Sequence, residues 1–165
     1  MSIRRSFEGI LILFIAFLTS CAIEQVSYKK DTSVAVWDLE NMSPTGFAGS
    51  DMGELLSAKV IETLRDTGDY IVVEREQIVL VLEELGLGTT ALADEATRLR
   101  LGRLVGAQLM VFGGYQIVGD KMRLDIRLVE VETGRVLNAT QKTTLANDLA
   151  KWLRAAEEAT IEVFQ

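Results

Sequence analysis

The architecture of this chain is set by one continuous run, Gln108-Leu-Met-Val-Phe-Gly-Gly-Tyr-Gln-Ile-Val-Gly-Asp-Lys-Met-Arg-Leu-Asp-Ile-Arg-Leu128. Its first half, 108–117, is apolar and predicts a buried strand, with a bulge or a close approach at Gly113-Gly114. Gly119-Asp120 is a two-residue hairpin signal of type II′. Apolar and charged residues then alternate, as Met122, Leu124, Ile126 and Leu128 against Arg123, Asp125 and Arg127. This alternation predicts a second strand with one buried and one wet face.

The chain continues from this hairpin into a third predicted strand. Val129 and Val131 have the opposite parity to the buried positions before them, which predicts a bulge or a second buried surface. Thr133-Gly134 is a turn signal, and 135–145 returns as a polar strand. The second half therefore predicts an antiparallel meander.

The flanking segments predict one further pair of strands and four helices. Strands are expected at 33–39 and 70–74, and helices at 52–67, 75–85, 95–105 and from 148 onward. The predicted N-terminal caps are Asp51 with Glu54 for the first helix, Asp94 for the third and Asn147 for the last. The residues expected to share the inward face of the last helix are Leu149, Leu153, Ala156 and Val163. We predict an α+β fold (two-layer α/β) over residues 33–165, with an antiparallel meander, an N-terminal strand and helices packed on one face.

The amino terminus has the pattern of a secretory leader. Arg4 and Arg5 precede an apolar run, 10–18, which is too short for a permanent membrane span. Leu18-Thr19-Ser20-Cys21 follows, and it resembles the lipobox of bacterial lipoproteins, in which the thiol is acylated and the leader is cut before the cysteine. We predict a signal peptide at 1–20 and a lipidated Cys21 with a short tether at 21–32. The alternative is an uncleaved signal anchor with an incidental free thiol.

This placement limits the possible partners. The chain has a net charge of −7, and removal of Arg4, Arg5 and Glu8 with the leader makes it one charge more negative. An acidic domain does not attract nucleic acid or anionic lipid headgroups through its overall field. The tether residues 22–32 reach only about 40 Å when fully extended. The domain is therefore expected close to the membrane that holds its lipid anchor.

Residues that commonly carry catalysis are scarce. The chain has no histidine, and its single cysteine is Cys21. Glu83-Glu84 and Glu157-Glu158 are adjacent pairs on predicted helices, where neighbours diverge by about 100° and cannot face one substrate together. We expect no catalytic residues, no cofactor, no metal and no small-molecule substrate. The chain is expected not to be an enzyme.

Several short motifs together resemble a known family. They are Val34-Ala35-Val36 with Asp38, Tyr70-x-Val72-Val73-Glu74-Arg75, Leu101-Gly102-x-x-Val105-Gly106-Ala107, Val111-x-Gly113 and Leu128-Val129-x-Val131-x-Thr133-Gly134. Their order and spacing are similar to those of the curli assembly/transport (CsgG-like) lipoproteins. The compact periplasmic domain of that family is also similar to small flagellar and peptidoglycan-synthase-activator lipoproteins.

The resemblance implies non-enzymatic work at the outer membrane, in the secretion or assembly of surface structures, often as a ring. It also implies a channel or partner loop at 42–50, with Phe47 and Pro44 as the candidate residues. A loop aromatic folded onto its own domain is the alternative for Phe47. Glu74 and Arg75 are candidates for a structural salt bridge at the start of a helix.

The sequence departs from the transporter where that protein inserts two long membrane-spanning hairpins. The first would fall at 117–122, where only Gly119-Asp120 stands, and the second after Leu145, where the last helix begins. We therefore expect a short form without the pore. One function is then a structural or assembly lipoprotein, and the other is a regulatory lipoprotein that activates a peptidoglycan synthase. The short tether disfavours the second, because such an activator must cross the periplasm.

Self-association is also expected. The parity change at Val129 and Val131 and the apolar run 109–112 leave more apolar strand surface than one layer of helices covers. We predict a homo-oligomer, held to the membrane by its lipid anchor, with protein partners of the cell envelope.

Cys21→Ser tests the lipid anchor. Because only a thiol at this position accepts the lipid, the variant should accumulate as an uncleaved precursor that no longer incorporates labelled palmitate. Ala22, rather than an aspartate, after the cysteine leads us to expect the wild type in the outer membrane. Palmitate labelling that persists in the variant would contradict the assignment.

Overall fold

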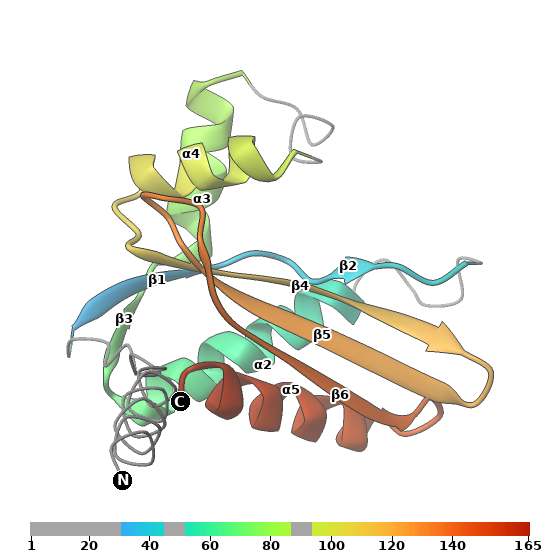
Figure 1. Cartoon of the computed structure of the whole chain (residues 1–165). Helices are drawn as coiled ribbons and strands as arrows, with labels where there is room; N and C mark the ends of the chain where they lie inside the picture. Colours follow the sequence, from blue (N-terminus) through green and yellow to red (C-terminus); the bar gives the residue numbers. More distant parts are fainter. Residues whose placement is uncertain (1–30, 45–51, 87–93) are drawn as a thin grey trace, which may run out of the picture.

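The computed structural model describes residues 31–44, 52–86 and 94–165, without the side chain of Arg75. These ranges form a mixed sheet with helices on both sides (Figure 1). The strands are β1 (Thr32–Val36), β2 (Glu40–Asn41), β3 (Tyr70–Val72), β4 (Leu109–Val118), β5 (Lys121–Glu130) and β6 (Val136–Leu145). The helices are α2 (Met52–Thr67), α3 (Arg75–Glu84), α4 (Glu95–Leu104) and α5 (Leu149–Val163). The predicted α+β class and the predicted order of elements are confirmed, with the short β2 added.

Strand β4 is the centre of the sheet. The strand order is β3-β1-β4-β5-β6, and β2 also pairs with β4. β1 and β2 run parallel to β4, whereas β5 and β6 continue from it as the antiparallel meander. Val118 pairs with Lys121 across the predicted two-residue turn, in which Gly119 has a φ of 62°. The register of β4 and β5 is continuous, so Gly113-Gly114 marks a close approach and not a bulge.

One core lies between the sheet and the helices α2 and α5. Met122, Leu124, Ile126 and Leu128 of β5 are all fully buried there, as their alternation predicts. Tyr115 of β4 packs in the same core with Trp152 of α5, with ring centroids 5.9 Å apart. This core contains most of the buried apolar side chains of the described ranges, and it fixes which face of the meander turns inward.

A second core lies on the opposite face, under α3 and α4. It contains Met110, Phe112, Val129 and Val131 together with Ile78 of α3. The prediction that all helices pack on one face is therefore wrong for α3 and α4, which Figure 1 shows across the sheet from α2 and α5. The parity change at Val129 corresponds to this second buried surface, and the pairing of β5 with β6 also shifts register there. Because these residues are buried within the chain, they do not provide the surface for self-association that the sequence predicted.

Helix α5 begins one residue later than predicted. Asp148, not Asn147, is its cap, and the Asp148 carboxylate accepts the backbone N–H of Lys151 at 3.1 Å. That hydrogen bond lowers the pKa of Asp148. The inward face carries Trp152, Ala155, Ala156, Ala159 and Val163, whereas Leu149 is 47% exposed. The Trp152 indole donates to the Leu145 carbonyl at 2.9 Å, which fixes the phase of the helix.

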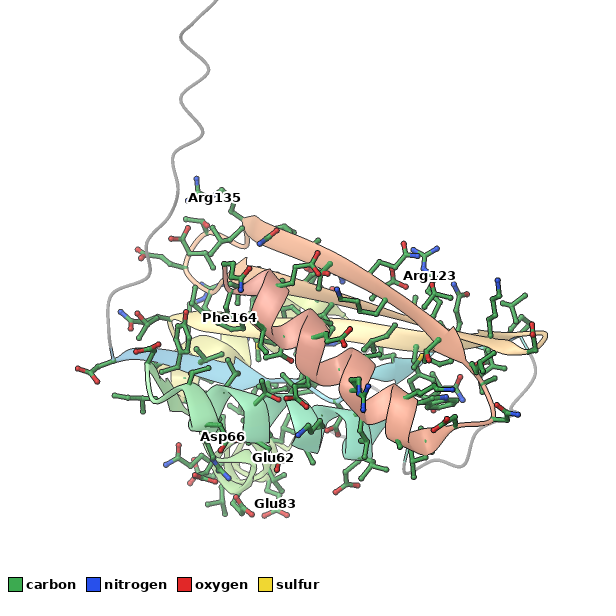
Figure 2. The ribbon with its side chains drawn as sticks, turned by 90° about the horizontal axis from the view of Figure 1, so that it is seen from below. Glu62, Asp66, Glu83, Arg123, Arg135 and Phe164 are labelled. Carbon is green, nitrogen blue, oxygen red and sulfur yellow. The ribbon has the colours of Figure 1, made fainter. Side chains whose placement is uncertain are left out.

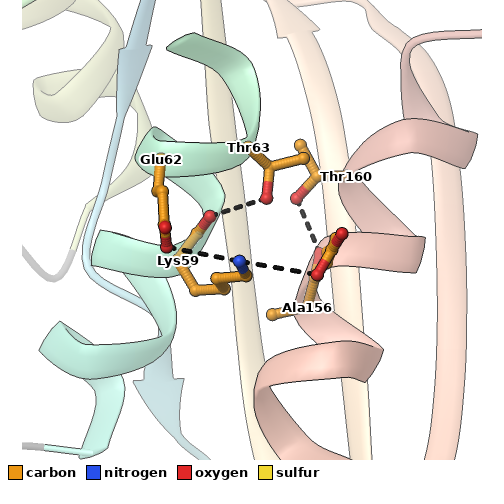
Figure 3. A network of polar contacts seen from close by, with 6 residues as sticks. Lys59, Glu62, Thr63, Ala156 and Thr160 are labelled. Carbon is orange, nitrogen blue, oxygen red and sulfur yellow. Dashed lines mark hydrogen bonds and ion pairs between the residues drawn. The ribbon is translucent and has the colours of Figure 1, made fainter. Parts of the chain in front are cut away.

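A polar network lies where α2 and α5 pack side by side (Figure 3). The Lys59 ammonium lies 3.3 Å from Glu62 on its own helix and 3.4 Å from Glu157 on α5. The hydrogen bond with Glu62 is the main cause that raises the pKa of Lys59. Thr63 and Thr160 each donate to a carbonyl of their own helix, which satisfies both hydroxyls. The two helices can therefore approach closely with their polar atoms paired.

Helix α2 also fixes the chain that links β1 to β2. The Ser57 hydroxyl donates to the Gly53 carbonyl at 2.6 Å and accepts the backbone N–H of Leu39 at 3.0 Å. A Cβ on Gly53 would lie 2.1 Å from the Leu39 carbonyl oxygen. Only glycine at position 53 allows the helix to lie this close to the strand connection.

Gly53→Ala should reverse the usual effect of such a change. Alanine normally stabilises a helix interior by about 1 kcal/mol relative to glycine. Here we expect a loss of about 1–3 kcal/mol, because the new methyl group meets backbone. Gly102→Ala in α4 is the matched control, since its Cβ would meet only side-chain atoms at 3.3 Å or more. Urea unfolding that shows Gly53→Ala no less stable than Gly102→Ala would contradict this packing.

Candidate functional site

A groove of about 420 Å³ opens on the α4 side of the sheet, where β2 pairs with the middle of β4. Side chains of both charges surround it, and two glycines of β4 contribute to its lining. The lining residues are Glu40, Met42, Glu95, Arg98, Gly113, Gly114, Asp125 and Arg127. This groove is the candidate interaction site of the domain.

Arg98 of α4 is the buried centre of the groove, with 9% of its surface exposed. Its guanidinium carbon lies 5.9 Å from the Trp37 ring centroid and 5.8 Å from that of Phe112. The guanidinium also forms an ion pair with Glu40 of β2. Cation–π contacts and an opposite charge together compensate the cost of burying an arginine. Arg98 thus attaches α4 to β2 and to the centre of the sheet.

Gly114 makes room for the chain of β2 and Met42 beside β4. A Cβ at this position would lie 2.5 Å from the Met42 sulfur and 2.9 Å from the Glu40 carbonyl oxygen. The Met42 backbone N–H donates to the Tyr115 carbonyl at 2.8 Å, which holds the chain in this close approach. The lack of a side chain at Gly114 therefore shapes one side of the groove.

The far side of the groove is formed by the charged face of β5. Arg127 lies 3.7 Å from Glu95 of α4, and Arg123 holds Asp125 with hydrogen bonds of 2.6–3.0 Å. The Asp125 carboxylate raises the pKa of Arg123 through these hydrogen bonds. Such alternating charges suit the binding of a polar protein segment that carries both signs.

The predicted channel or partner loop, 42–50, begins at the groove residue Met42. The Ser43 hydroxyl accepts the backbone N–H of Ile117 at 3.0 Å, and Pro44, the next residue, is exposed. The groove residue Met42 is thus two positions from Pro44. Phe47 and Cys21 lie outside the described residues, so their predicted roles stay predictions.

Glu74 lies at a separate cleft of about 320 Å³ between α2, β3 and α3. Both oxygens of the Glu74 carboxylate accept hydrogen bonds from Arg65 of α2, each at 2.8 Å. The side chain of Arg75 lies outside the described residues. Glu74, the N-cap residue of α3, therefore joins the start of α3 to α2, and because both partners are half exposed the pair contributes little to stability.

The structure brings together residues that the sequence prediction did not connect. Arg98 and Glu40 were not predicted as site residues, although helical periodicity places Arg98 on the same face as Leu101 and Gly102. That periodicity was the available signal for a buried arginine. Within the described ranges, no group of three or more acidic, cysteine or histidine residues is arranged to hold a metal ion. None of the helices described there combines the length and apolar character needed to cross a membrane.

The fold defines a class of α+β domain whose central strand pairs in parallel with β1 and β2 and begins an antiparallel meander on its other side. The chain belongs to the family of the curli production assembly/transport component CsgG, whose family model matches residues 20–119. The resemblance drawn from the sequence motifs is thereby confirmed. A comparison with curated proteins gives no significant match.

Solved structures share the fold at low sequence identity. The LpoB C-terminal domain from Salmonella enterica is 18% identical with a TM-score of 0.61, over 73% of this chain and 87% of that one. Lipoprotein GNA1162 from Neisseria meningitidis is 18% identical with a TM-score of 0.56, over 79% and 96%. A PelC dodecamer from Paraburkholderia phytofirmans is 16% identical with a TM-score of 0.52, over 81% and 88%.

Arg98→Ala should destabilise the fold by about 2–4 kcal/mol, because it removes both ring contacts and leaves α4 without its buried attachment. Glu40→Gln should cost about 1 kcal/mol or less, since Glu40 is half exposed and Arg98 keeps both rings. Arg127→Ala is the exposed control and should change stability by about 0.5 kcal/mol or less. Urea unfolding in which Glu40→Gln costs more than Arg98→Ala would contradict the central role of the rings.

Proposed function

We propose that this protein is a non-enzymatic lipoprotein of the outer membrane, facing the periplasm, and that it serves as a structural component in secretion or in the biogenesis of surface structures. Membership in the CsgG family supports the setting. The leader and the Leu18–Cys21 motif support the lipid anchor independently. According to this proposal, the protein acts by binding other proteins of the envelope and copies of itself.

The observation that carries the proposal is the shortness of two connections. Gly119 and Asp120 alone join β4 to β5, and residues 146–148 alone join β6 to α5. These are the positions at which the sequence resemblance places the spanning hairpins of the full transporter. The domain therefore corresponds to the periplasmic part of the transporter, without the pore-forming insertions.

The groove beside Arg98 is the proposed contact for an envelope protein. Arg127, Glu95 and Asp125 lie at its rim. Its centre is filled by the Arg98 guanidinium, which packs against the Trp37 and Phe112 rings. Its charges are mutually paired, which suits recognition of a segment that also carries both signs and does not suit bond cleavage. Catalysis is not part of the proposed function.

A regulatory lipoprotein that activates a peptidoglycan synthase by contact is the second candidate. The compact fold without insertions favours it, because a regulator needs only a binding surface. The reach of the tether counts against it, since about 40 Å of extended chain holds the domain near its anchor. Whether the protein alters synthase activity is thus the discriminating property.

The lipidated protein should not perforate a membrane. Every backbone N–H and C=O at membrane depth must be paired, and the two short connections give no length for strands that could pair there. Purified protein added to planar bilayers should give no discrete conductance steps. Reproducible single-channel currents that disappear on substitution of Phe47 would show that the protein itself is a pore.

The same preparation separates the two candidate functions. Addition to the peptidoglycan synthases of the host should leave their rate of glycan polymerisation unchanged, with Cys21→Ser protein as the anchor control. Membrane fractionation should place the wild type in the outer membrane. A reproducible stimulation of one synthase would favour the regulatory function, and an inner-membrane location would contradict the proposed setting.

A further inference from the structure

Helix α3 is apolar around much of its circumference. Residues 78–82 are Ile-Val-Leu-Val-Leu, which is more than one full turn, so these side chains cannot all face the sheet. Ile78 is buried in the second core, but Val79 is 42% exposed and Leu80 is 58% exposed. A helix with this pattern is normally covered on both sides. Within the described residues, nothing covers the outer side.

Three carboxylates surround Leu80 on that outer side. Glu76 and Glu84 lie one turn before and one turn after it, and Glu83 lies on the same face. All three are exposed. Figure 2 shows Glu83 on the same side of the molecule as Glu62 and Asp66 of α2, away from Arg123 and Arg135. The outer face of α3 therefore presents an exposed leucine, Leu80, surrounded by acidic side chains.

Helix α4 carries the complementary pattern. Leu104 is 54% exposed, and Arg100, one turn before it, and Arg103 are exposed on the same side. Neither arginine forms an ion pair with a residue in the described part of the chain, whereas Arg98 and Glu95 of the same helix are already paired. The outer face of α4 is therefore a leucine within a basic surface.

We propose that the acidic outer face of α3 in one copy of the chain binds the basic outer face of α4 in another copy. Leu80 and Leu104 would then cover each other, and Glu83 and Glu84 would face Arg100 and Arg103. The two surfaces match in apolar character and are opposite in charge, which is what a specific protein contact requires. The three glutamates around Leu80 argue against binding to a lipid surface. If Leu80 entered the membrane, these glutamates would be brought close to anionic headgroups, which repel them.

This contact rests on the assembly role proposed above and names the surface that mediates it. Because the two faces are different patches of one chain, repeated contacts can link several copies, or two copies can bind reciprocally through both pairs of helices. Two leucines and two charge pairs form a small interface. Anchoring to one membrane surface would strengthen it by raising the local concentration of the domain.

Charge reversal in two separate variants tests the contact. The full chain, purified in detergent, is measured by sedimentation velocity up to tens of micromolar as wild type, as Glu83→Arg with Glu84→Arg, and as Arg100→Glu with Arg103→Glu. Each variant alone should self-associate at least about tenfold more weakly, because like charges then face each other. An equimolar mixture of the two should recover association to within about threefold of the wild type. Recovery on mixing excludes a simple folding defect.

Two controls and one direct measurement complete the test. Val118→Ser, at an apolar site 63% exposed on β4, should leave association unchanged, whereas Leu80→Ser should weaken it. Glu158→Arg on α5 is the matched charge control. A photo-crosslinking amino acid at position 80, used in intact cells, should join two copies of the chain, with the crosslinked peptide from α4.

Several results would overturn the contact. The first is self-association that is equally strong in the wild type and in both charge-reversal variants. The second is a strict monomer in solution and in membranes, and the third is a crosslink from position 80 to lipid or to a different protein. A chain that fractionates with the outer membrane but associates despite both reversals, or crosslinks from position 80 to lipid or to a different protein, loses only the α3–α4 contact. A strict monomer also contradicts the binding of copies proposed above. A chain without palmitate or outside the outer membrane contradicts the proposed function instead.

Discussion

The register between β4 and β5 is the constraint on which the rest of the structure depends. β4 also pairs with β1 and β2, so any shift in it moves the whole sheet. The side chains of a strand alternate between faces, and a slip of one residue would carry Leu124 and Ile126 out of the first core and Arg123 into it. The two-residue turn at Gly119-Asp120 excludes this slip by fixing where pairing begins.

The candidate groove follows from that register. β2 pairs along the edge of β4, and its Glu40 carbonyl and the Met42 side chain come so close to one β4 residue that this residue must lack a side chain. Gly114 is that residue, and it brings Glu40 of β2 to the position where Arg98 of α4 can pair with it. A single backbone requirement thus places a loop, a helix and a buried charge around one groove.

The meander and the order of elements could be predicted because they depend on local signals, namely alternation, turn glycines and helical period. The side of the sheet on which α3 and α4 lie could not, because it depends on right-handed crossovers between the parallel strands β3, β1 and β4, whose pairing the sequence does not show. Asn147 and Asp148 are equally good cap residue types, so the sequence could not decide which carboxylate or amide accepts the backbone N–H of Lys151; in the structure it is Asp148. The Arg98 site needed the tertiary neighbours Trp37 and Phe112, which are far from it in sequence.

The same register allows two connections of the domain to vary in length. Pairing of β4 with β5 is complete at Val118 and Lys121, so residues inserted between them would extend the hairpin without changing any pair below it. The entropic cost of a longer connection grows only slowly with its length. Residues could likewise be inserted between β6 and α5, because the Asp148 cap lies within the helix and the Trp152 indole bonds Leu145 at the end of the strand, so neither contact uses the residues between them. The domain can therefore keep both of its cores while these two connections change in length.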